Sequence, residues 1–155
     1  MVKIASVDVE KQTVSGCPYI GYRVKTDNAA HDVFALIENF QSCCERYGAS
    51  AYMDETNTNE LTHHALLLSE DDSPNMDTRL NHLREVVAGQ DIVSITWKDL
   101  STNKRIDPQT NVVVVYVSLA SGTRLCLKLY NEHNGYYYHD IRLKWFDFED
   151  NSNCL

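Results

Sequence analysis

The chain has 155 residues, enough for one compact domain of ordinary size and too few for two. Its 14 basic and 22 acidic side chains give a formal net charge of −8. This balance argues against duplex nucleic acid as a partner, because such binding needs a surplus of Lys and Arg to displace counterions from phosphate. Apolar residues make up 43% of the chain, which excludes collagen-like and disordered classes. The sequence therefore predicts a single domain over residues 1–155.

Nothing near the N-terminus has the pattern of a targeting segment. Acids appear by Asp8, and no stretch approaches the ~20 consecutive apolar residues of a membrane-spanning helix. The five cysteines lack the CxxC spacing of zinc sites, so we expect free thiols in a reducing compartment: Cys17, Cys43, Cys44, Cys126 and Cys154. The sequence predicts a cytoplasmic protein with no signal peptide and no membrane association.

The N-terminal part predicts a β-hairpin. Tyr19 to Thr26 alternates apolar and charged residues, and Asp27-Asn28-Ala29 is typical of a tight turn before a second strand, from Asp32 to Asn39. A short helix from Gln41 to Tyr47 would follow. The apolar spacing from His31 to Gly48 also fits one amphipathic helix, and periodicity alone leaves both interpretations open. The turn favours the hairpin.

The middle of the chain predicts an acidic insertion at about residues 53–76, followed by a helix. Seven acids and no Lys or Arg lie between Met53 and Thr78, and elsewhere the charges nearly balance. An apolar island from Ala65 to Leu68 fits one short strand. Ser73-Pro74 is typical of a helix start, and Gly89 of its end. Between them, apolar residues recur at helical spacing: Met76, Leu80, Leu83 and Val87.

The last part predicts consecutive antiparallel strands, with a flexible tail from about residue 147. The strands span Val93–Lys98, Asn111–Leu119, Thr123–Tyr130 and Tyr136–Phe146, and the second is apolar enough to be covered on both faces. The predicted fold is α+β. It is an antiparallel β-sheet, a meander plus the N-terminal hairpin, with one or two short helices on one face.

Two stretches gather unusual polar and reactive residues: Gln41-Ser42-Cys43-Cys44-Glu45-Arg46-Tyr47-Gly48 and Tyr130-Asn131-Glu132-His133-Asn134-Gly135-Tyr136-Tyr137-Tyr138-His139. A thiolate is a nucleophile and histidine a general base, so the candidate catalytic residues are Cys43, Cys44, His133 and His139. Tyrosine rings and polar side chains suit ligands instead. The candidate binding residues are Gln41, Cys44, Glu45, Asn131, His133, Asn134, Tyr136, Tyr137 and His139. Strand alternation places His139 at the rim of the core.

Both stretches also have structural explanations. A buried cysteine is usually inert, a histidine near a turn often satisfies backbone groups, and tyrosine is a good strand former. Adjacent cysteines fit a tetrahedral zinc site poorly, and the chain has no glycine-rich loop that would cradle a phosphate. We therefore expect no metal site and no cofactor.

These two stretches, with the run from Ala88 to Asp99 between them, resemble an uncharacterised family of small proteins and domains from phages, large DNA viruses and some eukaryotes. The family is marked by Gln-X-Cys-Cys-Glu-X-X-Gly and Tyr-Asn-X-His-Asn-Gly-Tyr-Tyr-X-His patterns, and the resemblance extends from about Tyr19 to Trp145. The chain departs from the family at Tyr138, where a small residue is more usual, and in its longer acidic insertion. The resemblance favours the hairpin and implies no activity.

Two kinds of function fit these residues. The first is a small binding module, in which the two stretches meet at one end of the sheet and form a polar-aromatic pocket. Such a module would sequester a small molecule or nucleotide, or block a host protein. The second is a Cys/His-dependent hydrolase or transferase, with Cys43 or Cys44 as nucleophile, His133 or His139 as base and Glu45 orienting the histidine. A third interpretation treats both stretches as packing elements and assigns the function, protein docking, to the acidic insertion.

Overall fold

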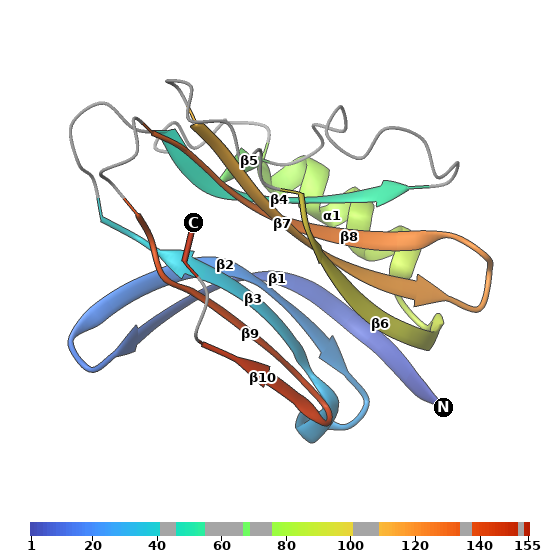
Figure 1. The fold of residues 1–155 in the computed structure, drawn as a ribbon. Helices are drawn as coiled ribbons and strands as arrows, with labels where there is room; N and C mark the ends of the chain where they lie inside the picture. The colour runs from blue at the N-terminus through green and yellow to red at the C-terminus, as the bar shows by residue number, and fades with distance from the viewer. Residues whose placement is uncertain (41–45, 55–66, 69–75, 101–108, 134–137, 152–153) are drawn as a thin grey trace.

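The computed structural model describes residues 1–40, 46–54, 67–68, 76–100, 109–133, 138–151 and 154–155. In this part of the chain it has ten β-strands and one α-helix (Figure 1). The strands before the helix are β1 (Val2–Val14), β2 (Cys17–Thr26), β3 (Val33–Glu38), β4 (Arg46–Asp54) and β5 (Leu67–Leu68). Helix α1 (Met76–Val87) precedes β6 (Asp91–Asp99), β7 (Gln109–Leu119), β8 (Arg124–His133), β9 (Ile141–Trp145) and β10 (Phe148–Asp150).

The strands form one continuous antiparallel sheet in the order β10-β9-β3-β2-β1-β6-β7-β8-β4-β5. The sheet curls so that its two halves face each other (Figure 1), and β1 joins β6 through only the Val2–Ile92 and Lys3–Asp91 pairs. β2 and β3 of one half lie against β4 and β8 of the other. The predicted antiparallel sheet is confirmed. The α+β label overstates the helical part, since α1 is the single α-helix among the described residues.

The main core fills the space between the two halves. Inward-facing side chains from both halves meet there, such as Tyr22 and Ile37 from the first and Ala49 and Val115 from the second. The even-numbered residues of β7, which point the other way, join a second buried cluster: Tyr52, Val112, Val114, Tyr116 and Cys126. Strand β7 is therefore covered on both faces, as its apolar sequence predicts.

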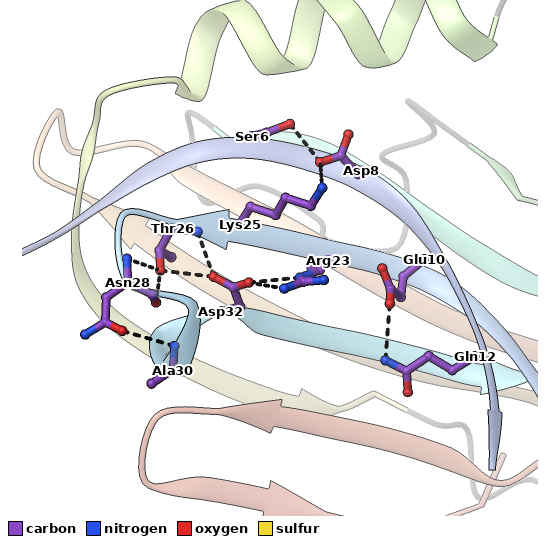
Figure 2. Close-up of polar contacts among 10 residues, drawn as sticks. All are labelled: Ser6, Asp8, Glu10, Gln12, Arg23, Lys25, Thr26, Asn28, Ala30 and Asp32. Carbon is purple, nitrogen blue, oxygen red and sulfur yellow. Dashed lines mark hydrogen bonds and ion pairs between the residues drawn. The ribbon is translucent and has the colours of Figure 1, made fainter.

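The β2–β3 hairpin is confirmed, with pairing from Tyr19–Glu38 to Val24–Val33. A short 3-10 helix, Ala29–His31, connects the strands, and the Asn28 side chain caps it by accepting a hydrogen bond from the Ala30 N–H. The buried carboxylate of Asp32 accepts hydrogen bonds from both Arg23 and Thr26 (Figure 2). These hydrogen bonds hold the connection between β2 and β3, at the place where the Asp-Asn sequence predicts a tight turn.

Helix α1 agrees with the predicted helix from Met76 onward, and the expected start at Ser73-Pro74 lies outside the described residues. Leu80, Leu83 and Val87 are buried in the main core, and Gly89 follows the helix with a φ of +79°. On its polar side, Arg84 Nε donates to the Val7 carbonyl at 2.8 Å. Arg84 Nη2 also donates to the Asp8 carboxylate at 2.6 Å, so one arginine ties α1 to β1.

The predicted short helix from Gln41 to Tyr47 is wrong at its C-terminal end. Arg46 and Tyr47 begin strand β4, and residues 41–45 lie outside the described part of the chain. Every second residue of β4 from Tyr47 to Ala51 packs in the main core, while the strand pairs with β8 along its whole length. Tertiary pairing therefore determines the conformation here.

The strand expected over Tyr136–Phe146 is shorter, and its partners differ from those of a meander. β9 pairs with β3 on one side and β10 on the other, so only β6, β7 and β8 form the meander. The tail expected to be flexible from about residue 147 contains β10, and Leu155 is buried in the main core. Met53 and Asp54, at the expected start of the acidic insertion, belong to β4, and most of the rest of the insertion (55–66 and 69–75) lies outside the described residues.

Candidate functional site

His139 occupies a fully buried position where the chain enters β9. Its backbone N–H and carbonyl pair with Leu155, at 2.6 and 2.7 Å. Its ring Nδ1 lies 2.8 Å from the Glu38 carbonyl oxygen, at the end of β3. Because a carbonyl only accepts hydrogen bonds, Nδ1 carries the proton, and Nε2 is the basic nitrogen of the neutral ring. The sequence placed this residue at the rim of the core; the structure places it inside.

Two aromatic rings stack on His139. The Phe40 ring lies 4.5 Å from it, centroid to centroid, at 10° between planes, and the Tyr47 ring lies 4.4 Å away at 28°. Two rings this close and this nearly parallel to a third must occupy its opposite faces. The Tyr47 hydroxyl donates to Asn39 Oδ1 at 2.8 Å. Phe40, just before the 41–45 segment, and Tyr47, two positions after it, therefore both contact His139.

Asn131 is the second predicted binding residue that the structure describes fully. It is buried in β8, opposite Tyr47 of β4 and Asn111 of β7. Its Nδ2 donates to the Leu155 carbonyl oxygen at 2.9 Å, the same oxygen that accepts from the His139 N–H. Asn131 and His139, eight positions apart in sequence, are thus brought together through Leu155.

Charged groups border this cluster at the ends of β3 and β9. Glu38 Oε1 accepts a hydrogen bond from the Asp140 N–H at 2.7 Å. Burial raises the pKa of the nearby Tyr19 hydroxyl, and the negative charges of Glu38 and Asp140 raise it further. The Arg142 guanidinium, 5.8 Å from the Tyr19 ring centroid, opposes this effect. The border therefore offers both a cation and two carboxylates.

The other predicted site residues are not described in full. His133 ends β8, but its side chain is outside the described part. Seven other predicted site residues lie wholly outside it: Gln41, Cys43, Cys44, Glu45, Asn134, Tyr136 and Tyr137. Their roles stay predictions. The sequence interpretation did not name Phe40, Tyr47 or Leu155 as site residues, and these three complete the cluster. The aromatic residues that bracket the Gln41–Glu45 run, Phe40 and Tyr47, were the available signal.

Among the described residues, no three His, Cys, Asp or Glu side chains are grouped so that they could hold a metal ion. No helix in the described ranges has the length and apolar character needed to cross a membrane. Comparison of the chain with protein-family models, with curated proteins and with solved structures gives no match.

Proposed function

We propose that this protein is a small-molecule binding module whose site lies around His139, and that its ligand carries a flat aromatic ring such as a nucleobase. The observation that carries the proposal is the three-ring stack of Tyr47, His139 and Phe40. Phe40 ends this stack and is 40% exposed. A planar ligand that lies on Phe40 would continue the stack, and base–aromatic stacking contributes about 1–3 kcal/mol per base.

Polar groups near the stack supply partners for the edges of such a ligand. The carboxylates of Glu38 and Asp140 accept hydrogen bonds, and the Arg142 guanidinium donates them. The buried cluster beneath the stack holds its rings in place, since His139 is fixed by Glu38 and Leu155. A site supported in this way loses little side-chain entropy on binding. Gln41, Cys44, Glu45, Asn134, Tyr136 and Tyr137 are proposed to complete it.

The test is a thermal-unfolding screen of nucleosides and nucleotides. A ligand at 100 times its Kd stabilises the folded state by about 2.7 kcal/mol. For a chain of this size, that corresponds to a rise in Tm of about 5–10 °C. Nucleosides belong in the screen because they present the base without phosphate. The critical variant is Phe40→Leu, which removes the ring from an exposed position and keeps an apolar side chain.

Phe146→Leu is the matched control. Phe146 is also exposed and also contacts a histidine, with its ring 4.4 Å from that of His31. The stabilising ligand should lose its effect on Phe40→Leu and keep it on Phe146→Leu. Failure of every nucleoside and nucleotide to stabilise the wild type, or an undiminished effect on Phe40→Leu, would contradict the proposal.

The Cys/His-dependent hydrolase or transferase is the second candidate, and one observation favours it. The hydrogen bond from Nδ1 to the Glu38 carbonyl sets the tautomer in which Nε2 of His139 can accept a proton. On this proposal the nucleophile is Cys43 or Cys44. Iodoacetamide should then alkylate one of them faster at neutral pH than the exposed Cys17 and Cys154. Cys43→Ser and Cys44→Ser identify which thiol reacts. Equal rates at all four thiols would count against catalysis.

A further inference from the structure

The outer face of the second half of the sheet, opposite the main core, carries an unusual polar pair. Ser50 of β4 and Lys128 of β8 are directly opposite each other in the antiparallel register. Both belong to the even-numbered set whose odd-numbered neighbours fill the main core. Directly opposed residues on one face have Cβ atoms about 4.5–5.5 Å apart, so their side chains are neighbours.

Both side chains are buried. Ser50 has no exposed surface, and its Oγ has no hydrogen-bond partner. Lys128 is 6% exposed. A buried hydroxyl without a partner destabilises the folded state, and a buried unpaired cation destabilises it more. Buried polar groups in folded proteins nearly always have hydrogen-bond partners, so two adjacent exceptions need an explanation.

The cations on this face differ in what they contact. Arg124 forms an ion pair with the buried Asp54. Lys128 forms no ion pair with any described carboxylate, and its Nζ lies 5.6 Å from the centroid of the Tyr130 ring. Burial lowers the pKa of Lys128, and the charge of Glu132, further along β8, opposes this only in part.

A second lysine lies in the same row of the sheet. The register joins Ser50 to Lys128, Lys128 to Val114 of β7, and Val114 to Lys98 of β6. Lys98 is exposed and also lacks a carboxylate partner among the described residues; its Nζ is 5.8 Å from the Tyr116 ring centroid. The row therefore extends from an exposed lysine to a buried lysine and a buried hydroxyl.

We propose that Ser50 and Lys128 form a second binding site, for a phosphate-type oxyanion, with Lys98 at its solvent end. One oxyanion beside this pair would accept a hydrogen bond from the Ser50 hydroxyl and a charge-assisted one from the Lys128 ammonium. It would thus satisfy both groups at once. A lysine suits this role because its ammonium acts as a compact point charge toward phosphate. The site is on the opposite face of the sheet from the main core and does not depend on the stack at Phe40.

The probe is inorganic phosphate, titrated into the intact chain against sodium chloride at equal ionic strength. Binding is followed by calorimetry and by the shift in Tm. The wild type should show a saturable effect of phosphate that chloride does not reproduce. Lys128→Met should weaken phosphate binding at least tenfold, and Ser50→Ala several-fold. Lys144→Met is the matched control, since Lys144 is an exposed lysine on β9, and its phosphate affinity should equal that of the wild type.

Lys128→Met exchanges a buried cation for an apolar side chain of similar length, and circular dichroism checks that both variants are folded. Should one fail to fold, the other still decides the question. The proposal is overturned if phosphate has no effect beyond that of chloride, or if folded Lys128→Met or Ser50→Ala binds phosphate like the wild type. Phe40→Leu separates the two proposals: it should bind phosphate normally, and a loss there would place the anion at the aromatic stack instead.

Discussion

Replacing Asp32 by asparagine removes a buried negative charge and keeps the shape of the side chain. Asp32 Oδ2 accepts hydrogen bonds from Arg23 Nε and Nη2, at 2.9 and 2.6 Å (Figure 2). Its Oδ1 accepts from the Thr26 N–H at 2.8 Å and from the Thr26 hydroxyl at 3.1 Å. An asparagine has one oxygen and one NH2 group. It can keep the Thr26 bonds only by turning its NH2 toward Arg23, which has no acceptor to offer.

The expected cost follows from burial. Removing one partner of a fully buried ion pair costs about 3–5 kcal/mol, and hydrogen bonds to charged groups contribute about 1.5–3 kcal/mol each. Asp32 is 3% exposed, but the Arg23 side chain is 29% exposed and lies 5.0 Å from the Phe34 ring centroid, so water solvates the orphaned cation in part. We therefore expect a loss of about 2–3 kcal/mol in the free energy of unfolding, below the range for a fully buried pair. This corresponds to a fall in Tm of roughly 4–12 °C.

Urea unfolding followed by tryptophan fluorescence measures this change. The chain has two tryptophans: Trp97 lies in the second half of the sheet, Trp145 in the first, and Phe148 contacts both. The fluorescence therefore reports on both halves. Asp8→Asn is the matched control. Asp8 also contacts charged and polar side chains, those of Arg84, Lys25 and Ser6, but its own side chain is 24% exposed. Because water solvates this carboxylate, its replacement should lower the free energy of unfolding by less than about 1 kcal/mol. If Asp32→Asn costs no more than Asp8→Asn, burial is not what makes the Asp32 ion pair important.

Outcomes are also expected for changes at three further positions: Gly21, Tyr22 and Asp8. Gly21→Ala should destabilise by about 1–3 kcal/mol or more in urea unfolding, because its Cβ would lie 1.9 Å from the Ala35 carbonyl oxygen and must push β2 from β3. Tyr22→Phe should leave stability at pH 7 unchanged or higher, since the buried Tyr22 hydroxyl has no hydrogen-bond partner. Burial also raises the pKa of Tyr22 far above its usual value of 10.0, so the unfolded chain releases this proton first. Wild-type stability should then fall as the pH rises above about 10, and Tyr22→Phe should fall less in alkaline unfolding curves. For Asp8, burial raises the pKa, but the hydrogen bonds from Ser6 and Arg84 and the charges of Arg84 and Lys25 outweigh it and hold the pKa below 3.8. The stability difference between wild type and Asp8→Asn should therefore be full above about pH 5 and vanish as the pH falls through the lowered pKa.

The parts of the fold that sequence predicted are those whose signals are local. The β2–β3 hairpin follows from alternation and an Asp-Asn turn, and α1 follows from Leu80, Leu83 and Val87 at helical spacing before Gly89. In each case the residues that determine the structure are close together in the chain.

Strand β4 shows why the rest could not be predicted. Gly48, Ala49, Ser50 and Ala51 are weak strand formers, and they are extended because β8 pairs with them and the main core needs small side chains there. The pairing of β9 with β3 could not be predicted either, because it joins residues that are distant in sequence. Val93 is 61% exposed although it continues an alternating pattern, because a bulge between Ile92 and Ser94 shifts the register.

The same limit applies to the candidate site. The sequence indicated Asn131 and His139, but not that Leu155 would bind both, because that contact depends on how the end of the chain folds back. Nor did it indicate that Phe40 and Tyr47 would enclose the His139 ring. The stack forms because Tyr47 comes from β4 in one half of the sheet, while Phe40 and His139 lie beside β3 and β9 in the other half. A contact between the two halves has no local signal in the sequence.

The pairing of β3 with β9 has a consequence for synthesis of the chain. One edge of β3 is satisfied by β2 as soon as the hairpin has emerged, but the other waits for β9, since Ile37 pairs with Ile141. About 100 residues separate these partners, so at roughly 5–20 residues per second the ribosome needs about 5–20 s to supply β9. During that time an apolar strand with unpaired backbone groups is open to any other extended chain. At the stage of the nascent hairpin, the open edge of β3 is therefore exposed to pairing with a wrong strand.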